Sequence, residues 1–332
     1  MPNNKIKATV LLGDPKLPDP VKKDGVFNPE DIETINALKK TLSLLENFEF
    51  TYLDNHQTFL ETLSLQKPQL VLNFCDEGFN NQATKELHIP ALLELLDIPY
   101  TGAGPTCLAT CYNKATVRLI ADSLQVPVPL EFYLSPNDPL PSSASFPVLI
   151  KPNFGDGSFG ITQSSVVYHQ AQFIEQLELM RKQFPHTPLL IQEYLEGPEY
   201  TVGLIGNPGN FEALPLIEID FSKLNDNLPK ILSYESKWVT DSPYWNNIIF
   251  KEAQLSDKNK EKLIAYAKQL FERMECRDYA RFDFRANKNG EIKLLEVNPN
   301  PGLNWLTLAD YADEILLDKI LTFACKRLGL FI

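Results

Sequence analysis

Three oxygen-bearing side chains near the C-terminus have the types and spacing of a metal site. An Asn-Gly pair at 289–290 separates two alternating runs, which predicts a β-hairpin with a type I′ turn. With those two residues as the loop, Asp283 lies opposite Glu296, and Asn298 lies on the same face. Opposed carboxylates repel each other, so the pair favours a bound cation. An all-oxygen set with two carboxylates is typical of Mg²⁺, which takes its other ligands from water and phosphates.

The same register predicts which hairpin face is buried. Arg281 is expected opposite Asn298, on the face of the carboxylates. The other face is apolar and is expected to enter the core; it carries Phe282, Phe284, Leu295 and Val297. An ordinary solvated pair of strands with surface charges is the alternative interpretation.

A lysine followed by a glycine-rich loop is a second candidate for phosphate chemistry. A predicted strand at 148–150 ends at Lys151, and residues 153–160 (Asn-Phe-Gly-Asp-Gly-Ser-Phe-Gly) lead to a predicted strand at 161–168. Glycines let backbone N–H groups approach phosphate oxygens closely, and Lys151 adds a point charge. No Gly-Lys-Ser/Thr sequence and no helix follow, so the loop is not a Walker A motif. A plain hairpin loop is the alternative.

Composition limits the partners of this 332-residue chain, which is 44% hydrophobic and 22% charged. A formal net charge of −12 argues against nucleic acid or an anionic membrane as a partner. An anionic substrate must therefore meet locally placed lysines and arginines. The sequence holds no apolar run of 18 residues, so no membrane span is expected.

The cysteines and histidines indicate neither disulfides nor zinc. Five cysteines occur without a Cys-x-x-Cys spacing, which is typical of reduced thiols and predicts a cytoplasmic protein. Cys107 and Cys111 are expected to be neighbours on one helix. The four histidines are dispersed, so a zinc site is not expected.

Hydrophobic periodicity divides the chain into three regions. In residues 1–103 strands alternate with helices, which predicts a parallel α/β sheet. Its expected strands are 8–12, 48–53, 70–74 and 98–101. Asn28 is the expected N-cap of the first helix, with Pro29 at the first helical position.

The other two regions are predicted to hold the glycine loop and the hairpin. Region 104–191 begins with a helix that carries Lys114 and contains the loop. Region 192–332 contains the metal hairpin and predicted helices at about 256–275 and 310–329, and strands are expected at 189–195 and 199–205. Residues 221–247 have no clear period and are predicted to form a structureless lid.

These pieces, in this order, resemble the ATP-grasp superfamily, and within it the D-alanine–D-alanine ligases and their relatives. The likeness covers nearly all of the chain after residue 70. It rests on segments 92–102, 113–114, 151–152, 192–199, 280–284 and 295–302. The resemblance implies an α/β (α+β) ATP-grasp fold in three subdomains: an N-terminal parallel sheet (1–103), a central β-rich flap (104–191) and a C-terminal antiparallel sheet with helices (192–332).

The resemblance also implies roles for individual residues. Asp283, Glu296 and Asn298 match the magnesium ligands, in agreement with the predicted hairpin. The residues that match an ATP site are Lys114, Lys151, Gly157, Ser158, Gln192, Glu193, Tyr194, Leu195, Glu199 and Lys237, with Glu199 at the ribose. The residues expected to act in catalysis are Arg281, Gly302, Lys237 and Ser158, with Arg281 and the Gly302 backbone at the developing oxyanion.

The implied reaction is ADP-forming ligation of a carboxylate to an amine through an acylphosphate. The expected cofactors are ATP and two Mg²⁺ ions, with Mn²⁺ as an alternative. The expected partners are small amino-acid or carboxylate substrates, and relatives commonly form homodimers. Catalysis of this kind depends on positioning and electrostatics, under a lid that excludes water.

The amino-acid half of the family pattern is altered in this chain. After the first strand the family has Gly-Gly and then a glutamate that holds the first substrate's amine, but this chain has Gly13-Asp14 and no glutamate before Glu30. Trp238 stands where the lid tyrosine falls, and Thr307 is closest to the serine that receives the second substrate's carboxylate. The expected activity is therefore ligation of substrates other than two D-alanines. The alternatives are a divergent D-alanine–D-alanine ligase or a nucleotide-binding regulatory protein without turnover.

Overall fold

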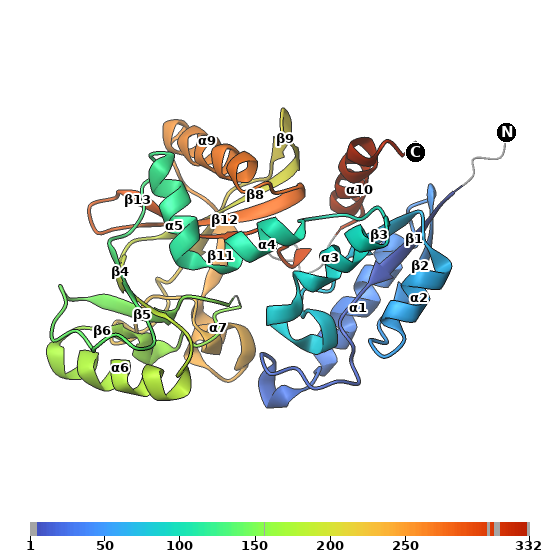
Figure 1. Ribbon diagram of the computed structural model, residues 1–332. Coiled ribbons are helices and arrows are strands. Elements are labelled where there is room, and N and C mark those ends of the chain that lie inside the picture. Colours follow the sequence, from blue (N-terminus) through green and yellow to red (C-terminus); the bar gives the residue numbers. More distant parts are fainter. Residues whose placement is uncertain (1–4, 156, 304–305, 309–312, 331–332) are drawn as a thin grey trace.

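The computed structural model describes residues 5–155, 157–303, 306–308 and 313–330 (Figure 1). They form a three-stranded sheet, a four-stranded sheet and a six-stranded sheet, with helices packed around them. The first sheet is parallel and the other two are antiparallel, which confirms the predicted α/β (α+β) class. In Figure 1 the parallel sheet lies on the right, and the other two lie one above the other on the left.

The N-terminal sheet has the order β2-β1-β3. Its elements are β1 (Ile6–Leu11), α1 (Pro29–Leu42), β2 (Phe48–Leu53), α2 (Phe59–Gln66), β3 (Leu70–Asn73) and α3 (His88–Leu95). Helix α1 begins as predicted, because Asn28 and Asp31 cap each other's backbone N–H groups at 2.9 and 2.8 Å.

The strand predicted at 98–101 is wrong. Tyr100 forms only an isolated parallel bridge with Val71. The chain turns away directly afterwards at Gly102, whose φ is +82°, and the Tyr100 carbonyl accepts a hydrogen bond from Arg327 at 2.8 Å. A strand partner is thus replaced by a side chain from the C-terminal helix.

The central sheet has the order β4-β7-β5-β6. Its elements are α4 (Pro105–Tyr112), α5 (Lys114–Ser123), β4 (Glu131–Leu134), β5 (Val148–Pro152), β6 (Val166–Val167), α6 (Gln170–Gln183) and β7 (Leu189–Glu193). The strand predicted at 161–168 shrinks to the two residues of β6, because Thr162 and Ser165 cap a short 3₁₀ turn before it. Asp156 of the glycine loop lies outside the described residues.

The C-terminal sheet has the order β11-β10-β8-β12-β13, and β9 pairs with β8. Its elements are β8 (Glu199–Asn207), β9 (Asn210–Ala213), β10 (Ile217–Asp220), β11 (Ile249–Glu252), α9 (Asp257–Arg273), β12 (Asp278–Ala286) and β13 (Ile292–Asn298). The last helix, α10, is Glu314–Leu328; residues 310–312 of its predicted range lie outside the described residues. Leu317, Leu321 and Cys325 of α10 pack in one cluster with the apolar side chains of β1, so the C-terminal helix completes the N-terminal core.

The lid segment 221–247 is not structureless, which corrects the prediction. It contains α7 (Tyr234–Trp238) and α8 (Pro243–Asn247). Ser242 caps α8 ahead of Pro243, and the buried Tyr244 hydroxyl donates to the Pro229 carbonyl at 3.0 Å. Helices of five residues carry too few repeats for a period to show in the sequence.

The hairpin of β12 and β13 has the predicted pairing at its functional end. Arg281 pairs with Asn298 and Asp283 pairs with Glu296, but a β-bulge follows Asp283. The loop is one residue longer than predicted, since Asn287 N–H donates to the Glu291 carbonyl at 2.9 Å. The bulge takes up the additional residue of β13. Leu294 therefore packs with Phe282 and Phe284 in the core, and Leu295 does not.

Candidate active site

Two cavities meet above the open face of the C-terminal sheet. The larger, of about 650 Å³, lies between the N-terminal region and β12 and β13. The smaller, of about 90 Å³, lies between the central and C-terminal sheets. Of the described residues, Lys114, Lys237, Arg281 and Glu296 line both cavities. These charged side chains therefore mark the place where the two cavities meet.

The predicted metal ligands converge at this junction. Asp283 accepts hydrogen bonds from Thr201 Oγ1 at 2.8 Å and from Asn298 Nδ2 at 2.9 Å. Arg281 Nη2 lies 2.9 Å from Asp283 Oδ2 and 4.0 Å from Glu296 Oε1. The cation that the opposed carboxylates require is thus supplied in this structure by Arg281, from the same strand.

The donor set also fits a divalent ion. Two carboxylates and the amide oxygen of Asn298, which a half-turn of that amide would present, are ligands that Mg²⁺ accepts. Burial on its own raises the pKa of Glu296, but the charges of Lys114, Lys237 and Arg281 overcome it and lower the pKa to about 2. The carboxylate is therefore ionised at neutral pH and able to bind a metal.

The small cavity gathers the residues that the resemblance assigns to a nucleotide. Lys151 Nζ donates to Gln192 Oε1 at 3.2 Å, and Gln192 Nε2 donates to Glu131 Oε2 at 2.7 Å. Burial, together with the charge of Lys114, lowers the pKa of Lys151 to about 8. The other predicted residues in its lining are Ser158, Glu193, Tyr194, Leu195 and Glu199.

A buried ion pair forms part of the lining of the small cavity. Glu199 lies 3.2 Å from Arg285, and the Arg285 guanidinium stacks over the Tyr194 ring at 5.5 Å. Burial raises the pKa of Glu199 to about 7, although Arg285 acts in the opposite direction. Sequence reasoning missed Arg285, yet the strand alternation that selects Arg281 and Asp283 also selects it. Leu295 was assigned to the core, but the bulge turns it into this lining.

The glycine loop and the lid hold each other over the junction. Ser158 Oγ donates to the Leu232 carbonyl at 2.8 Å, and Trp238 Nε1 donates to the Gly157 carbonyl at 3.3 Å. Lys114 Nζ donates to the Gly155 carbonyl from below. Loop, lid and Lys114 thus form one connected layer.

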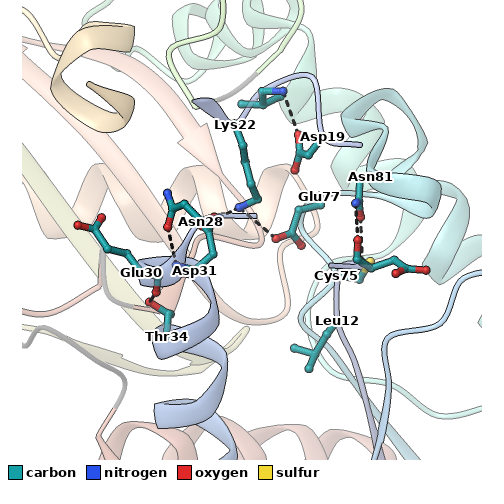
Figure 2. Close-up of polar contacts among 12 residues, drawn as sticks. Leu12, Asp19, Lys22, Asn28, Glu30, Asp31, Thr34, Cys75, Glu77 and Asn81 are labelled. Carbon is teal, nitrogen blue, oxygen red and sulfur yellow. Dashed lines mark hydrogen bonds and ion pairs between the residues drawn. The ribbon is translucent and has the colours of Figure 1, made fainter. Parts of the chain in front are cut away.

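The N-terminal side of the large cavity is built around Lys22 (Figure 2). Its ammonium lies 3.0 Å from Asp31 and 3.5 Å from Glu77, between α1 and the segment after β3. It also lies over the rings of Phe27 and Trp238, at 4.4 and 5.4 Å from their centroids. Sequence reasoning missed Lys22, because nothing local marks the loop between β1 and α1 as part of a site.

The altered first-strand motif has a direct structural consequence. A Cβ at Gly13 would lie 2.6 Å from the Glu77 carboxylate, so the absent side chain makes room for Glu77. Asp14 is buried and accepts from the backbone N–H groups of Lys16 and His56, at 2.9 and 3.0 Å. Asp14 therefore holds the loop, whereas Glu77 is among the carboxylates that line the cavity.

Most of the remaining predicted residues line the large cavity. Gly157, Trp238, Asn298 and Gly302 line the large cavity. Thr307 is not among the residues that line either cavity, and its substrate role stays a prediction. Asn300 was missed; it lines the large cavity, accepts from Tyr279 Oη at 2.5 Å and donates to Glu86 at 3.1 Å.

Comparisons with known proteins match this architecture. The family profile described as D-ala D-ala ligase C-terminus matches residues 137–311. A D-alanine–D-alanine ligase of Aquifex aeolicus (strain VF5) is 32% identical over 228 residues, which cover 68% of this chain and 70% of that protein. The chain belongs to the D-alanine–D-alanine ligase family.

Other relatives extend the likeness to the whole fold. An uncharacterised protein, y4sG, of Sinorhizobium fredii (strain NBRC 101917 / NGR234) is 29% identical over 65% of this chain, and the match spans 61% of that protein. A D-alanine–D-alanine ligase of Bacillus anthracis, solved in complex with ATP, superposes with a TM-score of 0.71 at 20% identity, over 98% of this chain and 99% of that one. This superposition confirms the predicted ATP-grasp fold. Among the described residues no helix combines the length and the apolar character that crossing a membrane requires.

Proposed function

We propose that the protein is an ATP-dependent ligase that joins a carboxylate to an amine and releases ADP and phosphate. The observation that carries this proposal is the junction of the two cavities. There the positive charges of Lys114, Lys237 and Arg281 act on Glu296, so cations and a carboxylate that could hold a metal lie where the small cavity meets the large one. Such an arrangement suits transfer of a phosphoryl group from one cavity to the other.

In this proposal the small cavity receives ATP. Lys114, which donates to the Gly155 carbonyl of the glycine loop, and Lys151 both line the small cavity, where they would meet phosphate charge. Glu199, held by Arg285, would accept from the ribose hydroxyls. Asp283, Glu296 and Asn298 would hold Mg²⁺, which supplies neutralisation of phosphate charge when bound. The volume of the recess as it stands is small, so we expect the loop and lid to move apart when nucleotide enters.

The large cavity would receive the carboxylate and the amine. A substrate carboxylate at the junction would be activated as an acylphosphate and then attacked by the amine. Arg281 and the Gly302 backbone line this cavity beside Glu296, where they would stabilise negative charge on the carbonyl oxygen. The connected layer of loop and lid would keep water from the activated carboxyl group.

Phosphate release over a panel of amino acids tests this function. The protein would be incubated with ATP, Mg²⁺ and single or paired D- and L-amino acids, with ADP measured and products identified by mass spectrometry. The proposal expects ADP formation that depends on the amino acid and a product lighter than its two components by one water. Nucleotide binding without turnover on any pair would favour the regulatory alternative.

D-Alanine alone is expected to support little turnover. The chain has no glutamate after the first strand to hold the first D-alanine, and Glu77, already paired with Lys22 at 3.5 Å, lies beside Gly13. Steady-state assays of ADP formation with D-alanine as sole substrate check this. Efficient synthesis of D-alanyl-D-alanine would instead support the alternative of a divergent D-alanine–D-alanine ligase. The similarity to the Aquifex D-alanine–D-alanine ligase is compatible with that alternative.

ATP affinity is expected to fall as the pH rises through about 8, the pKa to which burial lowers Lys151. Phosphate binds the protonated lysine, so loss of that proton removes one attractive charge, and bound nucleotide in turn raises the pKa. The KM for ATP should rise by up to about tenfold per pH unit above the inflection. The control is Lys151→Arg, whose guanidinium stays protonated and should flatten the profile. The same inflection in this variant would assign it to another group.

Trp238→Tyr is expected to change the preference among acceptor amines and to leave the KM for ATP within a few-fold. The indole lies over Lys22 in the large cavity and donates to the Gly157 carbonyl, so its replacement reshapes the substrate side of the lid. Lys237→Ala, one residue away, should instead weaken phosphate binding. Turnover of every acceptor should then slow, with little change in the preference among them. The measurement is kcat/KM over the acceptor panel for both variants. An equal decrease for all acceptors in Trp238→Tyr would make the indole a packing residue only.

A further inference from the structure

Three cysteines that the sequence keeps apart meet in one buried cluster. Cys107 and Cys111 lie four residues apart on one face of α4, and Cys276 comes two residues before β12 begins. Their sulfur atoms all lie within 4.8 Å of one another, and all three side chains are buried. Cys107 Sγ is 3.7 Å from Cys276 Sγ, and Cys111 Sγ is 3.8 Å from the thioether sulfur of Met274.

We propose that these four sulfur atoms bind one thiophilic d¹⁰ metal ion, Zn²⁺ or Cu⁺. A tetrahedral ion with metal–sulfur bonds of about 2.3 Å separates its ligand atoms by about 3.8 Å. The Cys107–Cys276 and Cys111–Met274 sulfur–sulfur distances, 3.7 and 3.8 Å, are close to that separation, and the other cysteine sulfur pairs lie within 4.8 Å. Thiolate and thioether ligands select soft ions over Mg²⁺, so this site is chemically distinct from the carboxylate site on β12 and β13.

The surroundings can balance the charge of such a centre. Three thiolates around a divalent ion carry one net negative charge. Arg277 follows Cys276 directly, and its positive charge acts on Cys107 more strongly than the opposing negative charge of Glu275. Its guanidinium is held by the Gly102 carbonyl at 3.2 Å and by Tyr100 Oη at 2.5 Å, so it stays beside the cluster.

An ion also has a route to the sulfur atoms. Cys111 is 7% exposed and belongs to the lining of the large cavity, together with its helix neighbours Leu108 and Tyr112. The other two thiols lie deeper, at 2% and 1% exposure for Cys107 and Cys276. An ion would therefore enter through the cavity and meet Cys111 first.

A bound ion would join two segments that position the active site. Helix α4 leads through Asn113 into α5, which begins at Lys114, and Cys276 leads into β12, which carries Arg281 and Asp283. The ion would cross-link these segments below the junction of the two cavities. This inference does not depend on the proposed ligase activity, because it rests on the sulfur atoms alone.

Metal titration of the reduced, chelator-stripped protein tests the proposal. Zn²⁺ would be titrated against a chromophoric chelator, and Cu⁺ against bicinchoninate without oxygen. We expect one equivalent per chain for at least one of the two ions, with a rise in melting temperature. Co²⁺ in place of Zn²⁺ should give thiolate-to-metal charge-transfer absorption and the intense visible bands of a tetrahedral ion. If both Zn²⁺ and Cu⁺ bind, their dissociation constants would be compared.

Matched cysteine variants connect the binding to this cluster. Cys276→Ala should weaken binding by at least about 100-fold, since even loss of an outer-shell partner weakens metal sites by up to about that factor. Cys325→Ala removes an equally buried thiol outside the cluster and should bind as the wild type does. If Cys276→Ala fails to fold, Met274→Leu keeps the volume of the thioether and should alter the Co²⁺ spectrum.

Two results would overturn the proposal. The first is a wild-type protein that binds neither ion stoichiometrically while its fold is intact. The second is binding that Cys276→Ala and Met274→Leu leave unchanged. In either case the three thiols serve as small apolar side chains in the core around Ala280 and Phe282.

Discussion

Glu296→Gln is expected to abolish metal-dependent ATP turnover, with kcat lowered by at least about 1,000-fold, or about 4 kcal/mol. Glu296 is the carboxylate common to both cavities, and Lys114, Lys237 and Arg281 keep it ionised. Glutamine keeps the shape of the side chain but removes the charge that would hold Mg²⁺. ADP formation at saturating Mg²⁺ and at the best substrate pair measures the effect.

The matched control is Glu291→Gln at the exposed turn of the same hairpin, where the side chain is 58% exposed. It should keep wild-type turnover. Retention of more than about a tenth of the activity by Glu296→Gln would show that this carboxylate does not hold the metal.

Glu296→Gln should also lower the stability of the ligand-free protein at neutral pH. The folded-state pKa of Glu296 is depressed to about 2, below its ordinary value, so its charge stabilises the fold above the unfolded-state pKa. That contribution is lost as the pH falls from about 4.5 towards 2. Melting temperatures of wild type and Glu296→Gln should therefore differ at pH 7 and converge in acid. Equal melting temperatures at both pH values would contradict the assigned pKa.

Arg281→Lys is expected to lower kcat by about 100- to 1,000-fold while the KM for ATP changes by only a few-fold. The guanidinium binds both oxygens of Asp283 and reaches into the large cavity beside Gly302. Lysine preserves the positive charge next to Asp283. Its single ammonium group cannot bind both oxygens of that carboxylate and also donate to a substrate carbonyl oxygen. Steady-state kinetics with ATP and the acceptor varied separately would show the difference.

Arg285→Lys is the comparison on the same strand face. Arg285 pairs with Glu199 in the lining of the small cavity, which we propose as the ATP site, so its replacement should raise the KM for ATP and affect kcat less. If both variants changed kcat and KM in the same proportion, Arg281 would have no special role at the reacting carbonyl.

The functional end of the hairpin could be predicted from sequence because its information is local. Alternation along residues 278–286 and 292–298 determines which side chains share a face, and an Asn-Gly pair marks the turn. The pairing of Asp283 with Glu296 was confirmed even though the loop length was wrong. The bulge after Asp283 compensates for the longer loop. Strand β12 also pairs with β8, a distant segment that a local sequence pattern does not include.

Residues brought together from distant segments could not be predicted in this way. Lys22 is held in the large cavity by Asp31, Glu77 and the lid indole, which belong to three separate segments. Cys276 meets α4 across 169 residues of chain, so no spacing in the sequence indicates the thiol cluster. The C-terminal helix likewise completes the N-terminal core, a contact that periodicity within either segment does not reveal.

Transfer of oxygen from substrate to phosphate would show most directly whether the junction activates a carboxylate by phosphorylation. The protein would be given ATP, Mg²⁺ and amino acids labelled with ¹⁸O in the carboxyl group, and the released phosphate would be analysed by mass spectrometry. We expect one labelled oxygen in each phosphate released together with product. ADP and product formed with unlabelled phosphate would contradict it.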